Sequence, residues 1–357
     1  MIIDIVKVFI PAVFAFIVGI SFTPFLTSFL YKNEMWKKKA GKVDMSGKDT
    51  PLFNELHKTR DINTPRMGGV VIWFSALFVV TVLWILSKIF PIEIFLKLDF
   101  MSRDQTWIPV FTLFAGALIG LLDDWLEIKG SKDHVAGGLS LKKRLLAIMV
   151  IGLFIGYWFY DKLDIVSIGL PGGHFLFIGW LIIPLFAIVM TFIYSGGIID
   201  GIDGLAGGVF ASTFAAYAGI AFYQHQINLA AFCAVVLGGI LAFLWFNIPP
   251  ARFYMTETGS MALTITLAVV AFMTDSLGDG YGLIVLPIIA LPLVVTSLSN
   301  IIQIGSKKFR NGKKVFLISP LHHHFEALGW PAYKVTMRYW IIGVILAVIG
   351  MSLALIG

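Results

Sequence analysis

The sequence predicts an all-α integral membrane protein of about ten transmembrane helices, with both termini extracytoplasmic and the ninth helix interrupted. Of its 357 residues, 58% are hydrophobic and only 13% are charged, more apolar surface than a water-soluble core hides. The apolar residues form runs long enough to cross about 30 Å of hydrocarbon as helices. These runs lack the short alternating pattern of a membrane β-barrel, so helices must satisfy the backbone hydrogen bonds.

Ten segments meet this length requirement when short and tilted runs are included. They are Val8–Tyr31, Gly68–Leu86, Trp107–Leu122, Leu145–Tyr160, Phe175–Ile199, Leu205–Tyr223, Leu229–Phe246, Met261–Thr274, Leu283–Ile304 and Val335–Ile356. The first run is too long for a signal-peptide core and has no clear small-residue cleavage site, so we expect it to remain a helix. Cys233 is the single cysteine and lies in an apolar run, which excludes an internal disulfide and predicts a buried, inert thiol.

Positive charge is concentrated in the connections on one side of the ten predicted spans. Nine Lys and Arg residues lie between Tyr31 and Arg66, five between Leu122 and Arg144, and seven between Ile304 and Arg338. The positive-inside bias makes this side cytoplasmic. The net charge of +6 therefore reflects orientation and an anionic substrate, and without a basic stripe or a base-stacking motif it predicts no nucleic acid partner.

Four polar clusters interrupt the apolar pattern, and all four fall on the predicted cytoplasmic side. Asp123 and Asp124 end the third span, and Asp200 and Asp203 occupy a Gly-rich turn after the fifth. The other two clusters are "WFNIPPARFYMTETGS", which contains Asn247, Arg252 and Glu257, and "SPLHHHFEALGWP", which contains His322, His323 and His324. We predict one polytopic domain over 1–357, with active-site loops near 32–66, 123–144, 200–204, 247–260 and 304–335.

Five carboxylates at one face of a basic protein favour a hard divalent cation. Mg²⁺ takes carboxylate oxygens and leaves positions open for substrate phosphates. Basic residues of the same loops could hold a polyanion: Lys58, Arg60, Arg66, Lys129, Lys132, Lys142, Lys143 and Arg144. Simpler interpretations compete with this one, since an acidic pair after a helix is often only a solvated end and Asp-Gly turns are often structural. Three adjacent histidines are poorly spaced for zinc, and phosphate contact or proton donation fits them better.

In these motifs the chain resembles the phospho-N-acetylmuramoyl-pentapeptide transferases, within the polyprenyl-phosphate N-acetylhexosamine-1-phosphate transferase superfamily. The likeness covers nearly the full length and includes "TPRMGG" at 64–69, "LLDDW" at 121–125, "GLSLKKRLL" at 138–146, "DGIDGLA" at 200–206, "WFN" at 245–247, "GSMAL" at 259–263 and "SPLHHHFEALGWPAYKVTMRYWIIG" at 319–343. The last stretch separates this branch from the related N-acetylglucosamine-1-phosphate transferases, which lack the triple histidine.

The resemblance implies an enzyme of peptidoglycan synthesis in the bacterial inner membrane, with a cytoplasmic active site. It would transfer phospho-MurNAc-pentapeptide from UDP-MurNAc-pentapeptide to undecaprenyl phosphate, giving lipid I and UMP, with Mg²⁺ required. It also implies a homodimer. Pro287 and Pro292 match the family's broken ninth helix beside a lipid-accessible groove, because each proline removes a backbone donor and disfavours a straight helix.

The resemblance also implies roles for particular residues. Asp123 would deprotonate or orient the lipid phosphate, with Asp124 beside it and Glu257 as a further metal ligand. His323 and His324 would contact or position the phosphates, next to His322. Residues on the substrate side would be Asp200, Asp203, Asn247 and Gln303 near the nucleotide and diphosphate, Tyr254 stacked on uracil, Lys142 at the sugar-phosphate, and Arg66.

The chain departs from the family pattern at positions that bear on the donor. Tyr194 and Gly197 replace two asparagines, Glu257 replaces a metal-binding aspartate, and Arg66 is added in "TPRMGG". The longer Glu side chain moves a carboxylate by more than about 1 Å, and Mg²⁺ geometry is strict.

Three functions therefore stay open on the sequence alone. The muramoyl-pentapeptide transferase is favoured by the histidine stretch. A sister transferase that uses another UDP-N-acetylhexosamine, such as UDP-GlcNAc, is favoured by the substituted positions. A transporter or non-catalytic lipid-binding homologue would show related halves and polar sites near mid-membrane, whereas these acids gather at one membrane face and no internal repeat is evident.

Overall fold

The structure, a computed structural model, describes residues 2–37, 63–102, 105–130, 138–278 and 280–356. Its long helices are α1 (Ile2–Lys32), α3 (Val70–Ile89), α5 (Trp107–Lys129), α6 (Leu141–Lys162), α7 (Ile182–Ser195), α8 (Leu205–Tyr223), α9 (Ile227–Asn247), α10 (Thr256–Met273), α12 (Leu291–Phe309) and α14 (Ala332–Ile356). Its shorter elements are α4 (Glu93–Leu98), α11 (Gly282–Ile289), α13 (Leu321–Ala327), three 3-10 turns η1 (Gly179–Leu181), η2 (Gly196–Ile199) and η3 (Ser276–Gly278), and strands β1 (Ser167–Leu170) and β2 (His174–Phe177). The predicted all-α membrane fold is confirmed.

Within the described residues, nine helices are long and apolar enough to cross a membrane, and the pair α11 and α12 makes a tenth if it counts as one bent span. The two helices of this pair are bent by 71°. Pro287 lies inside α11, and Pro292 lies in the first turn of α12, where a missing backbone N–H costs no hydrogen bond. The predicted interruption of the ninth span is therefore confirmed.

The fifth predicted span begins too early. Residues 174–177 form β2, which pairs antiparallel with β1 in the register Ser167 to Phe177. Gly172 and Gly173 between the strands both have positive φ, which only glycine adopts without strain. The membrane-crossing segment starts at Gly179 instead of Phe175. The apolar "FLF" of β2 was absorbed into the span because a short apolar run does not distinguish a strand from a helix end.

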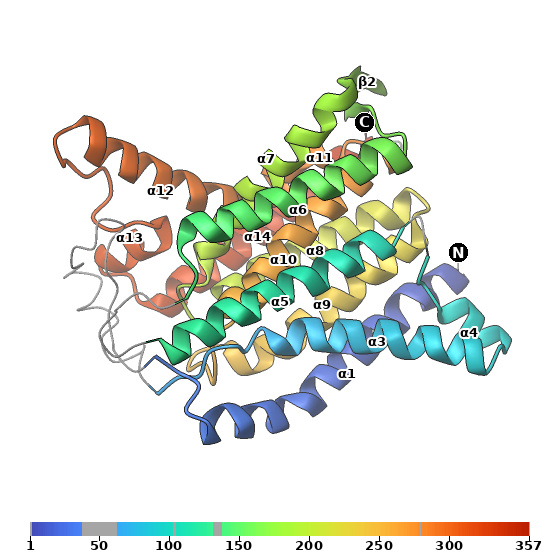
Figure 1. Cartoon of the computed structure of the whole chain (residues 1–357), viewed down its shortest axis with the longest axis horizontal. Coiled ribbons are helices and arrows are strands. Elements are labelled where there is room, and N and C mark those ends of the chain that lie inside the picture. Colours follow the sequence, from blue (N-terminus) through green and yellow to red (C-terminus); the bar gives the residue numbers. More distant parts are fainter. Residues whose placement is uncertain (1, 38–62, 103–104, 131–137, 279, 357) are drawn as a thin grey trace.

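Burial separates the central helices from those that face lipid. In the apolar window of α10, 94% of the residues are buried, against 78% in α9 and 22% in α1. Helices α6 and α14 are also mostly exposed, with large apolar side chains on their outer faces. Figure 1 shows α10 inside the bundle, with α5 and α6 on one side of it. A residue on α10 is therefore held by packing from several sides.

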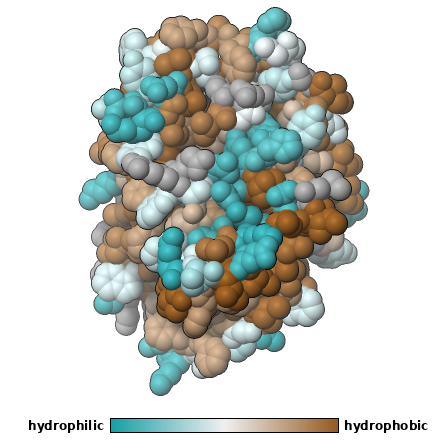
Figure 2. Space-filling model, turned by 90° about the vertical axis from the view of Figure 1, so that its right-hand side faces the viewer, coloured by the Kyte–Doolittle hydropathy of each residue, from teal (hydrophilic) through white to brown (hydrophobic). Residues whose placement is uncertain are grey.

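The two ends of the bundle differ. Figure 1 shows both termini at one end, and α13, the last turns of α5 and the first turns of α6 at the other. Figure 2 views the end with the termini, where hydrophilic side chains gather near the middle among apolar ones. The common end of both termini matches an even number of spans, while the side of the membrane that each end faces stays a prediction.

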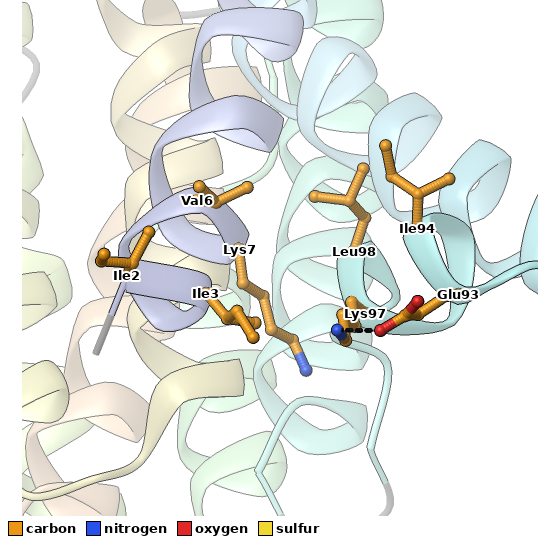
Figure 3. Close-up of a pocket in the computed structure, with 8 residues that line it drawn as sticks. All are labelled: Ile2, Ile3, Val6, Lys7, Glu93, Ile94, Lys97 and Leu98. Atoms are coloured by element: carbon orange, nitrogen blue, oxygen red, sulfur yellow. Dashed lines mark hydrogen bonds and ion pairs between the residues drawn. The ribbon is translucent and has the colours of Figure 1, made fainter.

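A surface groove of about 270 Å³ lies between the start of α1 and α4, at the end with the termini. Its lining is mostly apolar, and Figure 3 shows the Lys7 side chain extending along it towards the ion pair of Lys97 with Glu93. The length of the bundle separates this groove from the predicted active-site loops. It is therefore not the candidate active site.

Candidate active site

The site begins where α5 crosses α10. A Cβ atom at Gly120 of α5 would lie 2.2 Å from the backbone oxygen of Glu257, so only glycine permits this approach. Asp123 and Asp124 follow within the next turn of α5, and Glu257 stands in the first turn of α10. The close crossing therefore brings together three carboxylates from segments more than 130 residues apart.

Arg144 lies between two of these carboxylates. Its guanidinium forms an ion pair with Glu257 and a longer contact of 3.4 Å with Asp123 Oδ2. Asp123 also accepts a hydrogen bond of 2.5 Å from the backbone N–H of Leu139, and Tyr194 Oη donates to Glu257 Oε2 at 3.3 Å. Asp123 is almost fully buried, whereas the side chains of Arg144 and Glu257 are each 22% exposed. Part of the pair formed by Arg144 and Glu257 therefore faces solvent.

Asp124 is fully buried and points into the protein. Its Oδ2 accepts hydrogen bonds from Thr256 Oγ1 at 2.5 Å and from the backbone N–H of Thr258 at 2.9 Å. Arg66 lies 3.9 Å from Asp124 Oδ1 and pairs more closely, at 2.7 Å, with Glu127. Asp124 Oδ1 has no hydrogen-bond partner among the described residues. A buried carboxylate oxygen in this condition is costly unless a cation compensates it.

Thr256 connects the acidic residues of α5 with the Asp200 turn. Its hydroxyl donates to Asp124, and its backbone N–H donates to Asp200 Oδ2 at 2.7 Å. Its φ of 54° is unusual for a β-branched residue, and such strain persists only where surrounding contacts hold the backbone. The start of α10 is thus fixed by the acids that it helps to position.

Asp203 and Asn247 brace the same turn. Asp203 accepts a hydrogen bond from the backbone N–H of Ala251 at 3.1 Å. Asn247 accepts one from the backbone N–H of Gly204 at 2.9 Å and donates one to the backbone oxygen of Phe253 at 2.8 Å. Both ends of the Asn247 amide are therefore engaged by the protein backbone, and its nucleotide contact stays a prediction.

The histidine helix α13 meets the Asp200 turn at Gly201. A Cβ atom at Gly201 would lie 2.7 Å from Nε2 of both His322 and His323, so these two buried rings face the turn. His323 Nδ1 is 2.7 Å from Glu326 Oε2, which orients its ring. His324 instead accepts a hydrogen bond from the backbone N–H of Leu317 at 3.2 Å. The structure therefore places His322 and His323 at the site and turns His324 towards another segment.

Gln303, Tyr254 and Lys142 lie around this centre. The Gln303 amide is buried and bonded to the backbone of residues 315–316 at both ends. The backbone of Tyr254 pairs with Pro65 and Gly68, while its side chain is half-buried. Lys142 is exposed in the first turn of α6. Lys58, Arg60 and Lys132, and most of the predicted 32–66 loop, fall outside the described residues.

The carboxylates suit a divalent cation in chemistry, although they are not arranged around one. Among the residues that the structure describes, no three His, Cys, Asp or Glu side chains form a group that could hold a metal ion. The donors are nevertheless hard oxygen ligands of the kind that Mg²⁺ takes, and the buried Asp124 Oδ1 has no hydrogen-bond partner. The Arg144 guanidinium supplies positive charge between Asp123 and Glu257. The donor atoms are therefore compatible with the ion in their chemistry, while in this conformation a guanidinium stands between two of the three acids.

Two residues of this site were missed as individual functional candidates. Thr256 was quoted only within "MTETGS", and Arg144 only among the basic residues of its loop. Neither has a local signal, because the first acts through hydrogen bonds to two other segments and the second through an ion pair 113 residues away. The contact of Glu326 with His323 could have been predicted from sequence, because residues three positions apart in a helix lie on the same face.

Comparisons with known proteins place the chain among relatives that share one name. A family model described as Glycosyl transferase family 4 matches residues 106–275, which include the five carboxylates but neither Arg66 nor the histidines of α13. The chain is 32% identical over 336 residues to the phospho-N-acetylmuramoyl-pentapeptide-transferase of Chloroflexus aurantiacus, covering 90% of this chain and 85% of that protein. It is 33% identical to the one of Bacillus anthracis, with 94% of each chain covered. It is 30% identical to the one of Levilactobacillus brevis, covering 96% of this chain and 97% of that protein.

Proposed function

The chain belongs to the phospho-N-acetylmuramoyl-pentapeptide transferase family, and from this premise we propose that it transfers phospho-MurNAc-pentapeptide from its UDP carrier to undecaprenyl phosphate, forming lipid I and releasing UMP. One observation carries the proposal. Acids of α5, the Asp200 turn and α10 converge with His322 and His323 at one end of an apolar bundle. A lipid phosphate from the bilayer and a soluble nucleotide from the cytoplasm would meet there.

The reaction is a displacement at the donor's β-phosphorus. An oxygen of the lipid phosphate forms the new P–O bond, the bond to the oxygen shared with the α-phosphate breaks, and UMP leaves with that oxygen. Such transfer depends mainly on positioning and on charge stabilisation. We propose that Asp123 orients the attacking phosphate and that His322 and His323 donate hydrogen bonds to the diphosphate. A two-step route through a phospho-aspartate is the less favoured course.

We further propose that Asp123, Asp124 and Glu257 hold Mg²⁺. Asp124 Oδ1 would be one of the ligand atoms, because this oxygen has no hydrogen-bond partner in the described structure. When bound, the ion would neutralise phosphate charge as it develops. Arg144, which pairs with Glu257, and Lys142, exposed in the first turn of α6, would attract the polyanionic donor. A bacterial inner-membrane location, a cytoplasmic active site and a homodimer belong to the same proposal.

One feature of the site favours a different UDP-sugar as the donor substrate. Tyr194 and Gly197 stand where family members usually carry asparagines, and Tyr194 donates to Glu257 instead of facing a nucleotide with an amide. A sister activity with UDP-GlcNAc would exploit this altered surface. The histidine helix argues against it, so the muramoyl donor remains the main proposal.

The test is UMP release by the purified full chain in detergent, supplied with undecaprenyl phosphate and UDP-MurNAc-pentapeptide, with and without Mg²⁺. UDP-GlcNAc replaces the donor in a parallel reaction. Metal-dependent release with the muramoyl donor alone supports the proposal. UMP release with UDP-GlcNAc alone would establish the sister activity. If folded protein releases no UMP with either donor substrate, transferase activity is rejected.

A further inference from the structure

Arg144 lies where a bound cation would neutralise Asp123 and Glu257. Its guanidinium forms an ion pair with Glu257 and lies 3.4 Å from Asp123, so one positive group neutralises carboxylates from two helices. Asp124, by contrast, has its own donors in Thr256 and Thr258. Arg144 is therefore the cation that Asp123 and Glu257 share, while Asp124 lies 3.9 Å from a different guanidinium, that of Arg66.

We propose that Arg144 is a built-in counter-ion that competes with the divalent cation for Glu257 and Asp123, so that metal binding requires the guanidinium to leave them. The inference rests on the metal requirement proposed above and adds how that metal is admitted. Both groups of the Arg144–Glu257 pair are 22% exposed, which gives a hydrated ion access to them. Without either cation, two carboxylates would face each other in a partly buried space, an arrangement that like-charge repulsion disfavours.

Two further contacts favour exchange over permanent pairing. Arg144 stands in the first turn of α6, and its Nε is buried without a hydrogen-bond partner among the described residues, so the guanidinium is held by its two carboxylates alone. Glu257 keeps a second partner in Tyr194 Oη, which can hold the carboxylate while the guanidinium departs. The released guanidinium, a fork of donors suited to phosphate, would then face the incoming donor substrate.

The competition lowers the apparent metal affinity by the fraction of molecules in which the pair is closed. Arg144→Gln removes the competing charge and keeps a polar, shorter side chain. We expect this variant to bind Mn²⁺ on the order of ten-fold more tightly than the unmodified chain. Lys143→Gln is the matched control, because it removes one positive charge from an exposed neighbouring position, and it should change the affinity little.

The measurement is a titration of the purified full chain in detergent with Mn²⁺, following free Mn²⁺ by its electron paramagnetic resonance signal. Tighter binding by Arg144→Gln but not by Lys143→Gln supports the proposal. Equal or weaker binding by Arg144→Gln overturns it, even if UMP release proves metal-dependent. If no protein binds Mn²⁺ and UMP release needs no metal, the metal part of the proposed function fails as well.

A second measurement needs no variant. Phenylglyoxal modifies exposed arginine side chains, and peptide mass spectrometry reports the modified fraction of Arg144. Mn²⁺ should increase modification at Arg144 while leaving Arg338 of α14 unchanged. No increase at Arg144, in protein that binds Mn²⁺, would show that the guanidinium stays on its carboxylates and would overturn the proposal.

Discussion

At the residue scale, Thr256 shows how one side chain ties two acidic segments together. Its hydroxyl donates a hydrogen bond to Asp124 and its backbone N–H donates one to Asp200. Both carboxylates are therefore positioned by the strained first residue of α10. A residue of this kind contributes little to sequence patterns. Its importance lies in the contacts that hold its φ positive.

We predict that Thr256→Val lowers both stability and turnover. The variant keeps the shape but leaves the fully buried Asp124 without a hydroxyl donor, a loss of about 2 kcal/mol. Displacement of the carboxylates should reduce UMP release by roughly ten-fold or more. Thr256→Ser retains the hydroxyl and serves as the control, with thermal unfolding and UMP release measured on both. Equal behaviour of the Val and Ser variants would contradict the role of the hydroxyl.

Asp123→Asn tests the role proposed for the first aspartate. The amide oxygen can still accept from the backbone N–H of Leu139, so we expect folding to be largely preserved. The lost charge should reduce turnover by about 100-fold or more, as expected for a group that acts electrostatically in the transition state. The measurement is UMP release beside a thermal unfolding curve. Near-normal turnover would remove Asp123 from its proposed role.

At the element scale, the crossing of α5 with α10 decides whether the acids meet. Gly120→Ala would place a Cβ atom 2.2 Å from the Glu257 backbone oxygen, and backbone cannot yield as a flexible side chain does. We expect the helices to separate, with lower thermal stability and loss of UMP release. Gly305→Ala is the control, because α12 leaves open space around Gly305 and alanine favours a helix. A Gly120→Ala protein as stable and active as Gly305→Ala would refute this account of the crossing.

Much of the element pattern was predictable, because length and apolarity define membrane spans directly. Pro287 and Pro292 also predicted the break between α11 and α12. The hairpin at 167–177 was not predictable, since "FLF" joins the following apolar run without a boundary. Within the site, sequence grouped the acids correctly in space, yet the engaged amides of Asn247 and Gln303 depend on backbone atoms brought near only by folding.

At the whole-molecule scale, the two ends of the bundle have different chemistry. One end carries the acids and the histidines of α13, with Arg144 in the first turn of α6, and the other carries both termini and the β1–β2 hairpin. The positive-inside bias predicts that the basic end is cytoplasmic. A nucleotide donor made in the cytoplasm requires this orientation.

Labelling of engineered cysteines tests that orientation. His174→Cys in β2 and Lys313→Cys after α12 place thiols at exposed positions of opposite ends, while native Cys233 is fully buried and should stay silent. A membrane-impermeant maleimide should label the His174→Cys protein in intact spheroplasts, and the Lys313→Cys protein only after the membrane is opened. The cysteine-bearing chain without either substitution measures background from Cys233. The reverse labelling pattern would show that the protein has the opposite orientation in the membrane. The acids and histidines would then lie on the side that a cytoplasmic nucleotide cannot reach.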